Sequence, residues 1–170
     1  MSEPQSDTLT LRDAFRKADF SGKLALAFAS WFYTGLMPWA PGTFGTLMAV
    51  PLILALNHLG EFYEGLALLL LVPTAIWASS LCERHLGRSD PPEVVIDEVA
   101  GFLLTFFLLP LSWLTLCLGF FLFRFFDIAK PFPIGWLEKR VRGGTGVVLD
   151  DLLAGVYANL SLRLLMLWIS

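Results

Sequence analysis

Long apolar stretches dominate this chain of 170 residues and leave little polar surface for a fold in water. Each stretch is rich in Leu, Ala and Phe and lacks the alternation of a half-buried strand, so the pattern predicts helices. Hydrophobic residues make up 56% of the sequence and charged residues 16%, which is more apolar than an average soluble domain. We therefore expect an all-α, compact helical bundle with membrane-embedded helices. The apolar stretches cover residues 24–39, 44–59, 65–82, 99–126 and 152–169.

The longest apolar stretch, 99–126, contains Pro110 near its centre. Proline removes a helical hydrogen bond and clashes with the preceding turn, so it predicts a kink or the tip of a helical hairpin. A straight crossing would place Asp97 and Asp127 on opposite membrane faces. We expect the hairpin, which returns both acids to one face. Several other stretches are shorter than the roughly 20 residues of a straight crossing, which predicts partly re-entrant helices.

The basic residues predict the orientation and the domain organisation. Seven of the twelve Lys and Arg residues fall in the two polar loops 83–98 and 124–151, and such residues concentrate on the cytoplasmic side of membrane proteins. Residues 1–23 are polar and carry charges of both signs, unlike a secretory signal peptide. We expect them to form a partly flexible N-terminal segment. A single membrane-embedded domain would cover 24–170, with residues 24–39 lying along or dipping into the membrane.

Acidic residues at the edges of the apolar stretches form the candidate site. Carboxylates in such positions are unfavourable unless they bind something cationic, and Mg²⁺ prefers oxygen ligands. Arginine and lysine nearby can bind a phosphate. The candidate catalytic residues are Asp97, Glu98, Asp127, Asp150 and Asp151, of which Asp97, Glu98, Asp127 and Asp151 are the predicted metal ligands; Thr43, Arg124 and Lys130 are the predicted phosphate-binding residues.

Several of these residues also have a purely structural interpretation. Asp97 and Asp150 precede apolar runs and could cap helices, because carboxylates accept hydrogen bonds from free amides there. Arg124 and Asp127 could form a structural ion pair. The segment at Thr43 could be an ordinary turn.

Four sequence blocks resemble the signature blocks of the phosphatidylglycerophosphatase A family. They are APGTFGT at 40–46, VIDEVAG at 95–101, FRFFDIAKPFPI at 123–134 and GGTGVVLDDLLAG at 143–155, in the family's order. The resemblance runs from about residue 24 to the C-terminus. It implies an all-helical lipid phosphatase of the bacterial inner membrane, which uses Mg²⁺ to convert phosphatidylglycerophosphate to phosphatidylglycerol. It also makes Asp90, otherwise a turn former before two prolines, a secondary candidate.

Other classes of chemistry find no support in the sequence. The net charge of −3 does not indicate nucleic acid, and the glycine-rich segment 142–146 lacks the ending of a nucleotide P-loop, so we interpret it as a flexible connection. Cys82 and Cys117 lack CxxC spacing and are expected to be reduced core thiols.

The predicted function is therefore a Mg²⁺-dependent phosphatase of an anionic phospholipid, with its active site on the cytoplasmic face. A water molecule activated by the metal is the preferred nucleophile, and direct attack by an aspartate is the alternative. Two other functions remain open. One is a phosphatase of another lipid phosphomonoester, and the other is an ion-coupled transporter whose acids bind a cation. The oligomeric state stays open.

Overall fold

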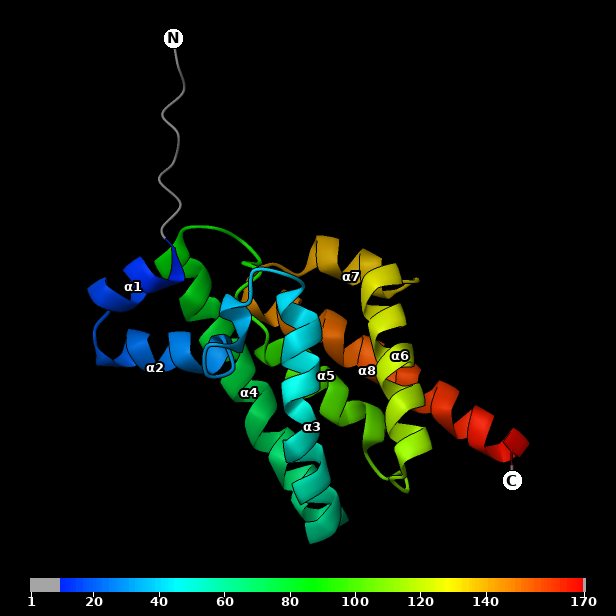
Figure 1. Cartoon of the computed structure of the whole chain (residues 1–170). Coiled ribbons are helices and arrows are strands. Elements are labelled where there is room, and N and C mark those ends of the chain that lie inside the picture. Colours follow the sequence, from blue (N-terminus) through cyan, green and yellow to red (C-terminus); the bar gives the residue numbers. More distant parts are fainter. Residues whose placement is uncertain (1–9, 170) are drawn as a thin grey trace.

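The computed structural model describes residues 10–169, and the regular secondary structure of this part of the chain is all helical (Figure 1). It contains eight α-helices, one short 3₁₀ turn and no strand, which confirms the all-α prediction. The elements are α1 (Leu11–Lys17), α2 (Phe20–Ala29), η1 (Thr34–Leu36), α3 (Pro41–Leu59), α4 (Glu61–Leu86), α5 (Ile96–Phe106), α6 (Trp113–Ala129), α7 (Ile134–Arg140) and α8 (Gly144–Ile169).

The N-terminal part of the described chain packs onto the bundle. The side chains of Leu11 and Ala14 on α1 are buried in a core cluster that includes residues of α4. The predicted boundary between residues 23 and 24 falls inside α2. Residues 1–9 of the predicted polar segment lie outside the described residues, so the prediction of a partly flexible segment there is untested.

The helix α5 forms the centre of the bundle, between α3 and α4 on one side and α6 on the other (Figure 1). Nine of its eleven residues are buried. The ring of Phe102 lies 5.0 to 6.0 Å from the rings of Phe106, Phe120 and Phe123, in tilted or edge-on arrangements that aromatic pairs favour. Because α5 has no solvent-exposed face, its position is determined by packing on all sides.

The helices α5 and α8 approach closely where each has a glycine. A methyl group on Gly101 would collide with the carbonyl oxygen of Asp151, and one on Gly155 would collide with the carbonyl oxygen of Gly101. Small residues at a helix crossing allow this contact between backbones. The crossing lies one turn from Asp97 on α5 and includes Asp151 on α8, so it brings two predicted site residues together.

The predicted helical hairpin around Pro110 is present. Helix α5 ends at Phe106 and α6 begins at Trp113, so Pro110 lies in the connection between them. Ser112 starts α6 through a capping box with Thr115, in which each side chain bonds the other residue's backbone amide. The chain therefore reverses, and the N-terminus of α5 and the C-terminus of α6 lie at the same end of the bundle (Figure 1).

Two side chains of α8 hold the buried C-terminal end of α5. The amide nitrogen of Asn159 donates to the carbonyl oxygens of Leu104, Thr105 and Phe107 at 2.9 to 3.4 Å. The guanidinium of Arg163 donates to the carbonyl oxygen of Phe107 at 3.0 Å and to the Asn159 side chain at 2.8 Å. The last carbonyls of a helix lack partners within it, so these bonds satisfy groups that would otherwise be unpaired.

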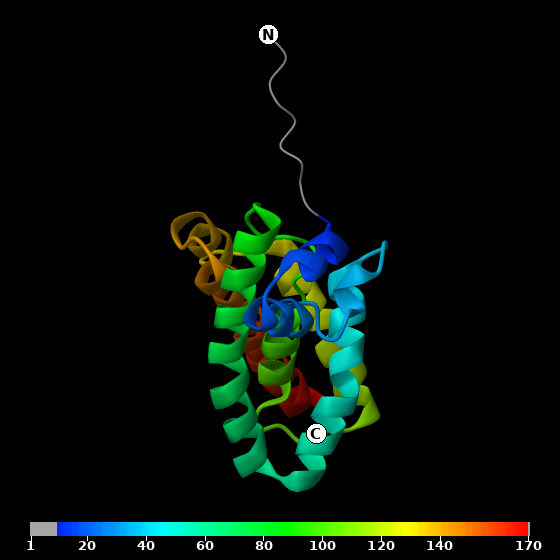
Figure 2. The same ribbon diagram turned by 90° about the vertical axis from the view of Figure 1, so that its left-hand side faces the viewer.

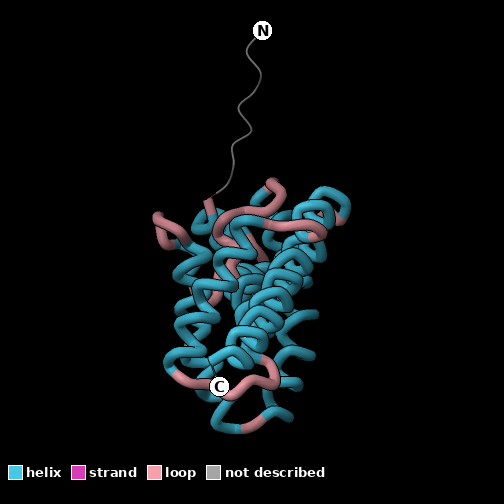
Figure 3. The backbone as a smooth tube through the Cα atoms, turned by 90° about the vertical axis from the view of Figure 1, so that its right-hand side faces the viewer, coloured by secondary structure: helices cyan, strands magenta, loops and turns pink. Residues whose placement is uncertain are grey.

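Within the described residues, α3 and α4 are long and apolar enough to cross a membrane. They run antiparallel and meet at Gly60, while α2 lies across them (Figures 1 and 2). Only 28% and 22% of their apolar windows are buried. Most of their apolar surface therefore faces outward, as the side chains of Leu47 and Leu69 do. Most loops gather at the two ends of the bundle (Figure 3).

Changing Gly101 to alanine is expected to lower the free energy of unfolding by about 1 to 3 kcal/mol, because the added methyl group meets backbone that cannot move aside. Gly65→Ala on α4 is the matched control, since its nearest neighbour outside the helix backbone is a ring carbon of Phe107 at 3.7 Å. Thermal unfolding of both variants in detergent tests this. Equal melting temperatures would contradict the close α5–α8 contact.

Candidate functional site

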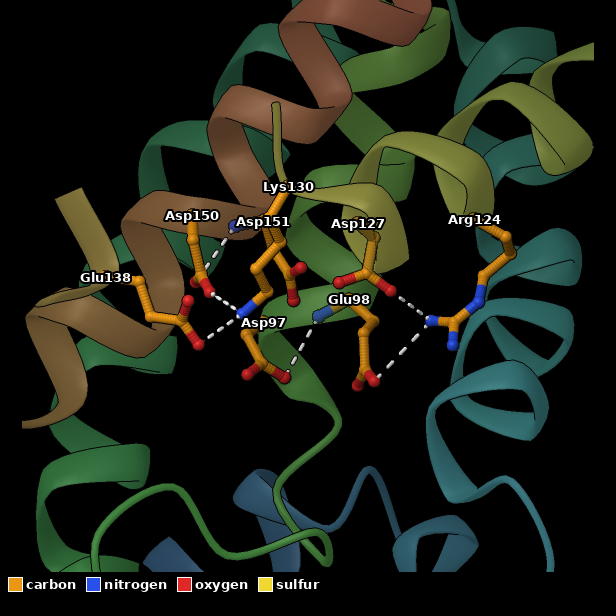
Figure 4. A network of polar contacts seen from close by, with 8 residues as sticks. All are labelled: Asp97, Glu98, Arg124, Asp127, Lys130, Glu138, Asp150 and Asp151. Atoms are coloured by element: carbon orange, nitrogen blue, oxygen red, sulfur yellow. Dashed lines mark hydrogen bonds and ion pairs between the residues drawn. The ribbon is translucent and has the colours of Figure 1, made fainter. Parts of the chain in front are cut away.

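A polar cavity of about 280 Å³ lies at the end of the bundle where α3, α5 and α8 begin and α6 ends. The backbone at Pro41 and Gly42 forms one wall, and Pro92 and Val94 form another. Charged residues from four separate segments line it, and Figure 4 shows all of them except Asp90. They are Asp90, Asp97, Glu98, Arg124, Asp127, Lys130, Asp150 and Asp151.

Three carboxylates in the cavity form a tight group. One oxygen each of Asp97, Glu98 and Asp151 lies within 4.8 Å of the other two. The side chains of Asp97 and Asp151 are buried, and the Oε2 atom of Glu98 is buried without a hydrogen-bond partner. Burying ionised carboxylates so close together is unfavourable unless a cation or protons compensate their charge. Three convergent carboxylate oxygens fit a hard divalent cation.

The pKa values of these carboxyl groups reflect this arrangement. Burial and the neighbouring Glu98 raise the pKa of Asp97 well above its usual range. Burial and the charge of Asp97 do the same to the pKa of Asp151. Burial and the charge of Asp127 raise the pKa of Glu98 to about 8, although Arg124 acts in the opposite direction. Without a cation, the group therefore favours retaining protons near neutral pH.

The two basic residues of the cavity pair with the other acids. The Nη1 atom of Arg124 lies 2.7 Å from Asp127 Oδ2 and 3.7 Å from Glu98 Oε1. Helix α6 ends at Ala129, so Lys130 is its C-cap, in the left-handed conformation with φ 41°. This turn takes Lys130 off the helix surface, and its Nζ lies 2.7 Å from Asp150 Oδ2. The predicted Arg124–Asp127 pair exists and faces the cavity.

The structure brings together all the predicted acids and both predicted cations, but Thr43 is not among the residues that line the cavity. Thr43 lies in the first turn of α3, and its neighbour Gly42 packs directly against the Glu98 carboxylate. A phosphate contact by Thr43 stays a prediction. Asp90 lines the cavity with a left-handed backbone, φ 48°. Burial raises its pKa.

The alternative that Asp150 caps a helix is wrong. Helix α8 begins at Gly144, so Asp150 lies in its second turn. Residues 144–146 of the glycine-rich segment form the first turn of this helix. The prediction that residues 142–146 are a flexible connection is therefore also wrong for these three residues. Asp97 follows Ile96 in the first turn of α5 and accepts a hydrogen bond from the Glu98 amide at 3.0 Å. Asp97 therefore satisfies one free amide while facing the acidic group.

Sequence patterns did not single out Glu138, whose Oε1 lies 2.7 Å from Lys130 Nζ. Glu138 stands beside two basic residues on the short helix α7, a pattern typical of an exposed helical surface. Glu138 and Lys130 come together because the chain turns after α6.

The two cysteines do not line the cavity. Both are free, Cys82 is buried and Cys117 is exposed. The prediction of core thiols is therefore confirmed for Cys82 and wrong for Cys117.

Comparison with known proteins gives one consistent family. A family model described as phosphatidylglycerophosphatase A matches residues 27–166. Phosphatidylglycerophosphatase A of Escherichia coli K12 is 34% identical over 126 residues, covering 74% of this chain and 73% of that protein. The protein of the same name from Haemophilus influenzae is 34% identical over 146 residues, covering 81% and 85%. A Bacteroides thetaiotaomicron protein, provisionally named phosphatidylinositol-3-phosphatase, is 38% identical over 144 residues, covering 79% and 89%. No solved structure gives a significant match.

The metal-free protein is expected to lose stability as the pH rises from about 4.5 to about 8. In this range the unfolded chain has released the Glu98 proton while the folded chain retains it, so the folded state is progressively disfavoured. The pKa values of Asp97 and Asp151 are also raised in the folded state, so these two groups act in the same direction. A divalent cation should offset the loss, most strongly near pH 8.

Melting temperatures in detergent, measured across this pH range with EDTA and with MgCl₂, test the prediction. Glu98→Gln cannot ionise and should flatten the pH dependence in EDTA. A melting temperature that rises with pH in EDTA would contradict the buried acidic group.

Proposed function

Because the chain belongs to the phosphatidylglycerophosphatase A family, we propose that it hydrolyses phosphatidylglycerophosphate to phosphatidylglycerol and phosphate in bacterial phospholipid biosynthesis. The family relationship already identifies a phosphomonoester hydrolase of lipid metabolism. One observation supports the assignment of the site: three buried, convergent carboxylates share a cavity with Arg124 and Lys130.

Mg²⁺ is the proposed cation, held by Asp97, Glu98 and Asp151. The unpartnered Oε2 of Glu98 and the close approach of the three oxygens support these ligands. Asp127, a predicted fourth ligand, lies outside this group and pairs with Arg124. When bound, the cation supplies Lewis acidity toward a phosphoryl oxygen and lowers the pKa of water.

The other charged residues bind and orient the terminal phosphate of the substrate. Arg124 and Lys130 supply positive charge on the side of the cavity formed by the end of α6. Asp127 and Asp150 hold these two cations at 2.7 Å, which limits their side-chain motion before substrate binds. Gly42 leaves room beside Glu98, because any larger residue would displace that carboxylate.

Water is the proposed nucleophile. The alternative, attack by an aspartate, would leave a phosphoryl group on the chain, which mass spectrometry of the quenched reaction would detect.

The lipid part of the substrate would lie along the apolar surface of α3 and α4, which we propose cross the bacterial inner membrane. Their outward-facing apolar side chains support this placement. An apolar groove of about 280 Å³, lined by Phe28, Trp31, Leu52 and Leu71 among others, lies between α2, α3 and α4 and could receive an acyl chain. The basic loops would place the cavity at the cytoplasmic face.

A second candidate is the hydrolysis of phosphatidylinositol 3-phosphate, because the Bacteroides relative carries that activity in its name. The cations of the cavity recognise a phosphate, and its carboxylates recognise a metal. Neither interaction depends on the group that is esterified to the phosphate. The family relationship favours either enzyme over the ion-coupled transporter.

Purified protein is expected to release phosphate from phosphatidylglycerophosphate with Mg²⁺ and to lose this activity in EDTA. Asp97→Asn, Glu98→Gln and Asp151→Asn should each lower kcat on the order of 100-fold or more, because each removes charge at the reacting centre. Glu61→Gln is the charge-matched control, at an exposed position in the first turn of α4.

Phosphatidylinositol 3-phosphate, assayed in parallel, tests the second candidate. Activity that survives both EDTA and all three substitutions would rule out the proposed site.

A further inference from the structure

Lys130 is held by two carboxylates that differ in burial (Figure 4). Its Nζ atom lies 2.7 Å from Asp150 Oδ2 and 2.7 Å from Glu138 Oε1. The Asp150 side chain is 10% exposed, whereas the Glu138 side chain is 42% exposed. The same lysine therefore has one partner in the protein interior and one at the surface.

The two partners also differ in the cavities that they line, because Asp150 lines two neighbouring cavities and Glu138 lines one of them. Lys130 and Asp150 line the main cavity. Glu138 lines a neighbouring pocket of about 190 Å³, which shares Asp90 and Asp150 with the main cavity. The Lys130–Glu138 ion pair thus lies at the boundary between the two cavities, and the proposed binding of metal makes no use of Glu138.

The two ion pairs should respond differently when an anion reaches Lys130. Separating Lys130 from Asp150 would leave a buried charge without its partner, which is strongly unfavourable. An exposed ion pair contributes little to stability, and water readily solvates the Glu138 carboxylate once it is released. A phosphate at Lys130 therefore competes with Glu138, while Asp150 stays in place.

This competition also acts after the reaction. Inorganic phosphate is an anion that Lys130 and Arg124 would hold in the cavity. The Glu138 carboxylate is part of the chain and lies beside Lys130, so it is always available to take the place of the departing phosphate. It weakens the binding of every phosphate group at this lysine, and that includes the product.

We propose that Glu138 is a positioning residue that occupies Lys130 in the free protein, yields it to the substrate phosphate and returns to it as inorganic phosphate leaves. The inference rests on the proposed function, because it concerns the phosphate-binding lysine of that site. If Glu138 competes with phosphate for Lys130, removal of its carboxylate increases the affinity of the protein for phosphate. If Glu138 merely supports the lysine, its removal lowers that affinity or leaves it unchanged.

The test compares Glu138→Gln with the wild-type protein. The variant should bind inorganic phosphate about two- to fivefold more tightly, the range expected for loss of one exposed ion pair as competitor. The inhibition constant of phosphate and the KM for phosphatidylglycerophosphate should fall by the same factor. Glu138→Asp keeps the charge and should restore values close to wild type. Glu61→Gln removes the same charge far from Lys130 and should change neither constant.

Isothermal titration calorimetry with inorganic phosphate, in detergent with MgCl₂, measures the affinity without any turnover. Unchanged or weaker phosphate binding by Glu138→Gln would overturn the role of Glu138, even if the wild type is an active lipid phosphatase. If the wild type hydrolyses neither lipid, the proposed function fails, and the calorimetric comparison still decides whether Glu138 competes for Lys130.

Discussion

The direct contact between the backbones of α5 and α8 is the constraint on which the site depends. Glycine at 101 and at 155 removes the side chains that would hold the two helices apart. The first turn of α5 then lies beside the second turn of α8, and carboxylates from both helices enter one cavity. Asn159 and Arg163 bond the other end of α5 and oppose its movement along α8. Helix packing therefore sets the spacing of the acids.

The acids of the cavity fall into two groups with different partners. Asp97, Glu98 and Asp151 converge on one another, and their pKa values rise because burial and the charges of neighbouring carboxylates disfavour ionisation, with Asp127 as the main such neighbour of Glu98. Asp127 and Asp150 each pair with a cation that faces the same space. A divalent cation would compensate the first group, while the second group holds the cations that meet a phosphate. This division suits a site for a metal and a phosphate ester together.

Much of the site could be predicted from local patterns, because acids at the edges of apolar helices need a compensating charge wherever the chain places them. Pro110 likewise predicts the reversal between α5 and α6, since proline cannot continue a helix without losing a bond. Helix α8 begins earlier than the sequence pattern predicts, because Gly144 and Gly146 resemble a loop by propensity but pack within the helix against α4 and Val141. Close tertiary contact can outweigh the low helix propensity of glycine.

Composition and local bonding are enough to predict the helical class, the apolar character of the bundle, the types of residue that carry the chemistry and the pairing of Arg124 with Asp127 one helical turn away. The packing of the helices is needed to show which acids converge, that Asp127 lies outside the group of three, and that Glu138 meets Lys130. These relations join segments that are far apart in the chain or separated by a turn. They depend on the angle and depth at which helices pack, and no local spacing in the sequence encodes either.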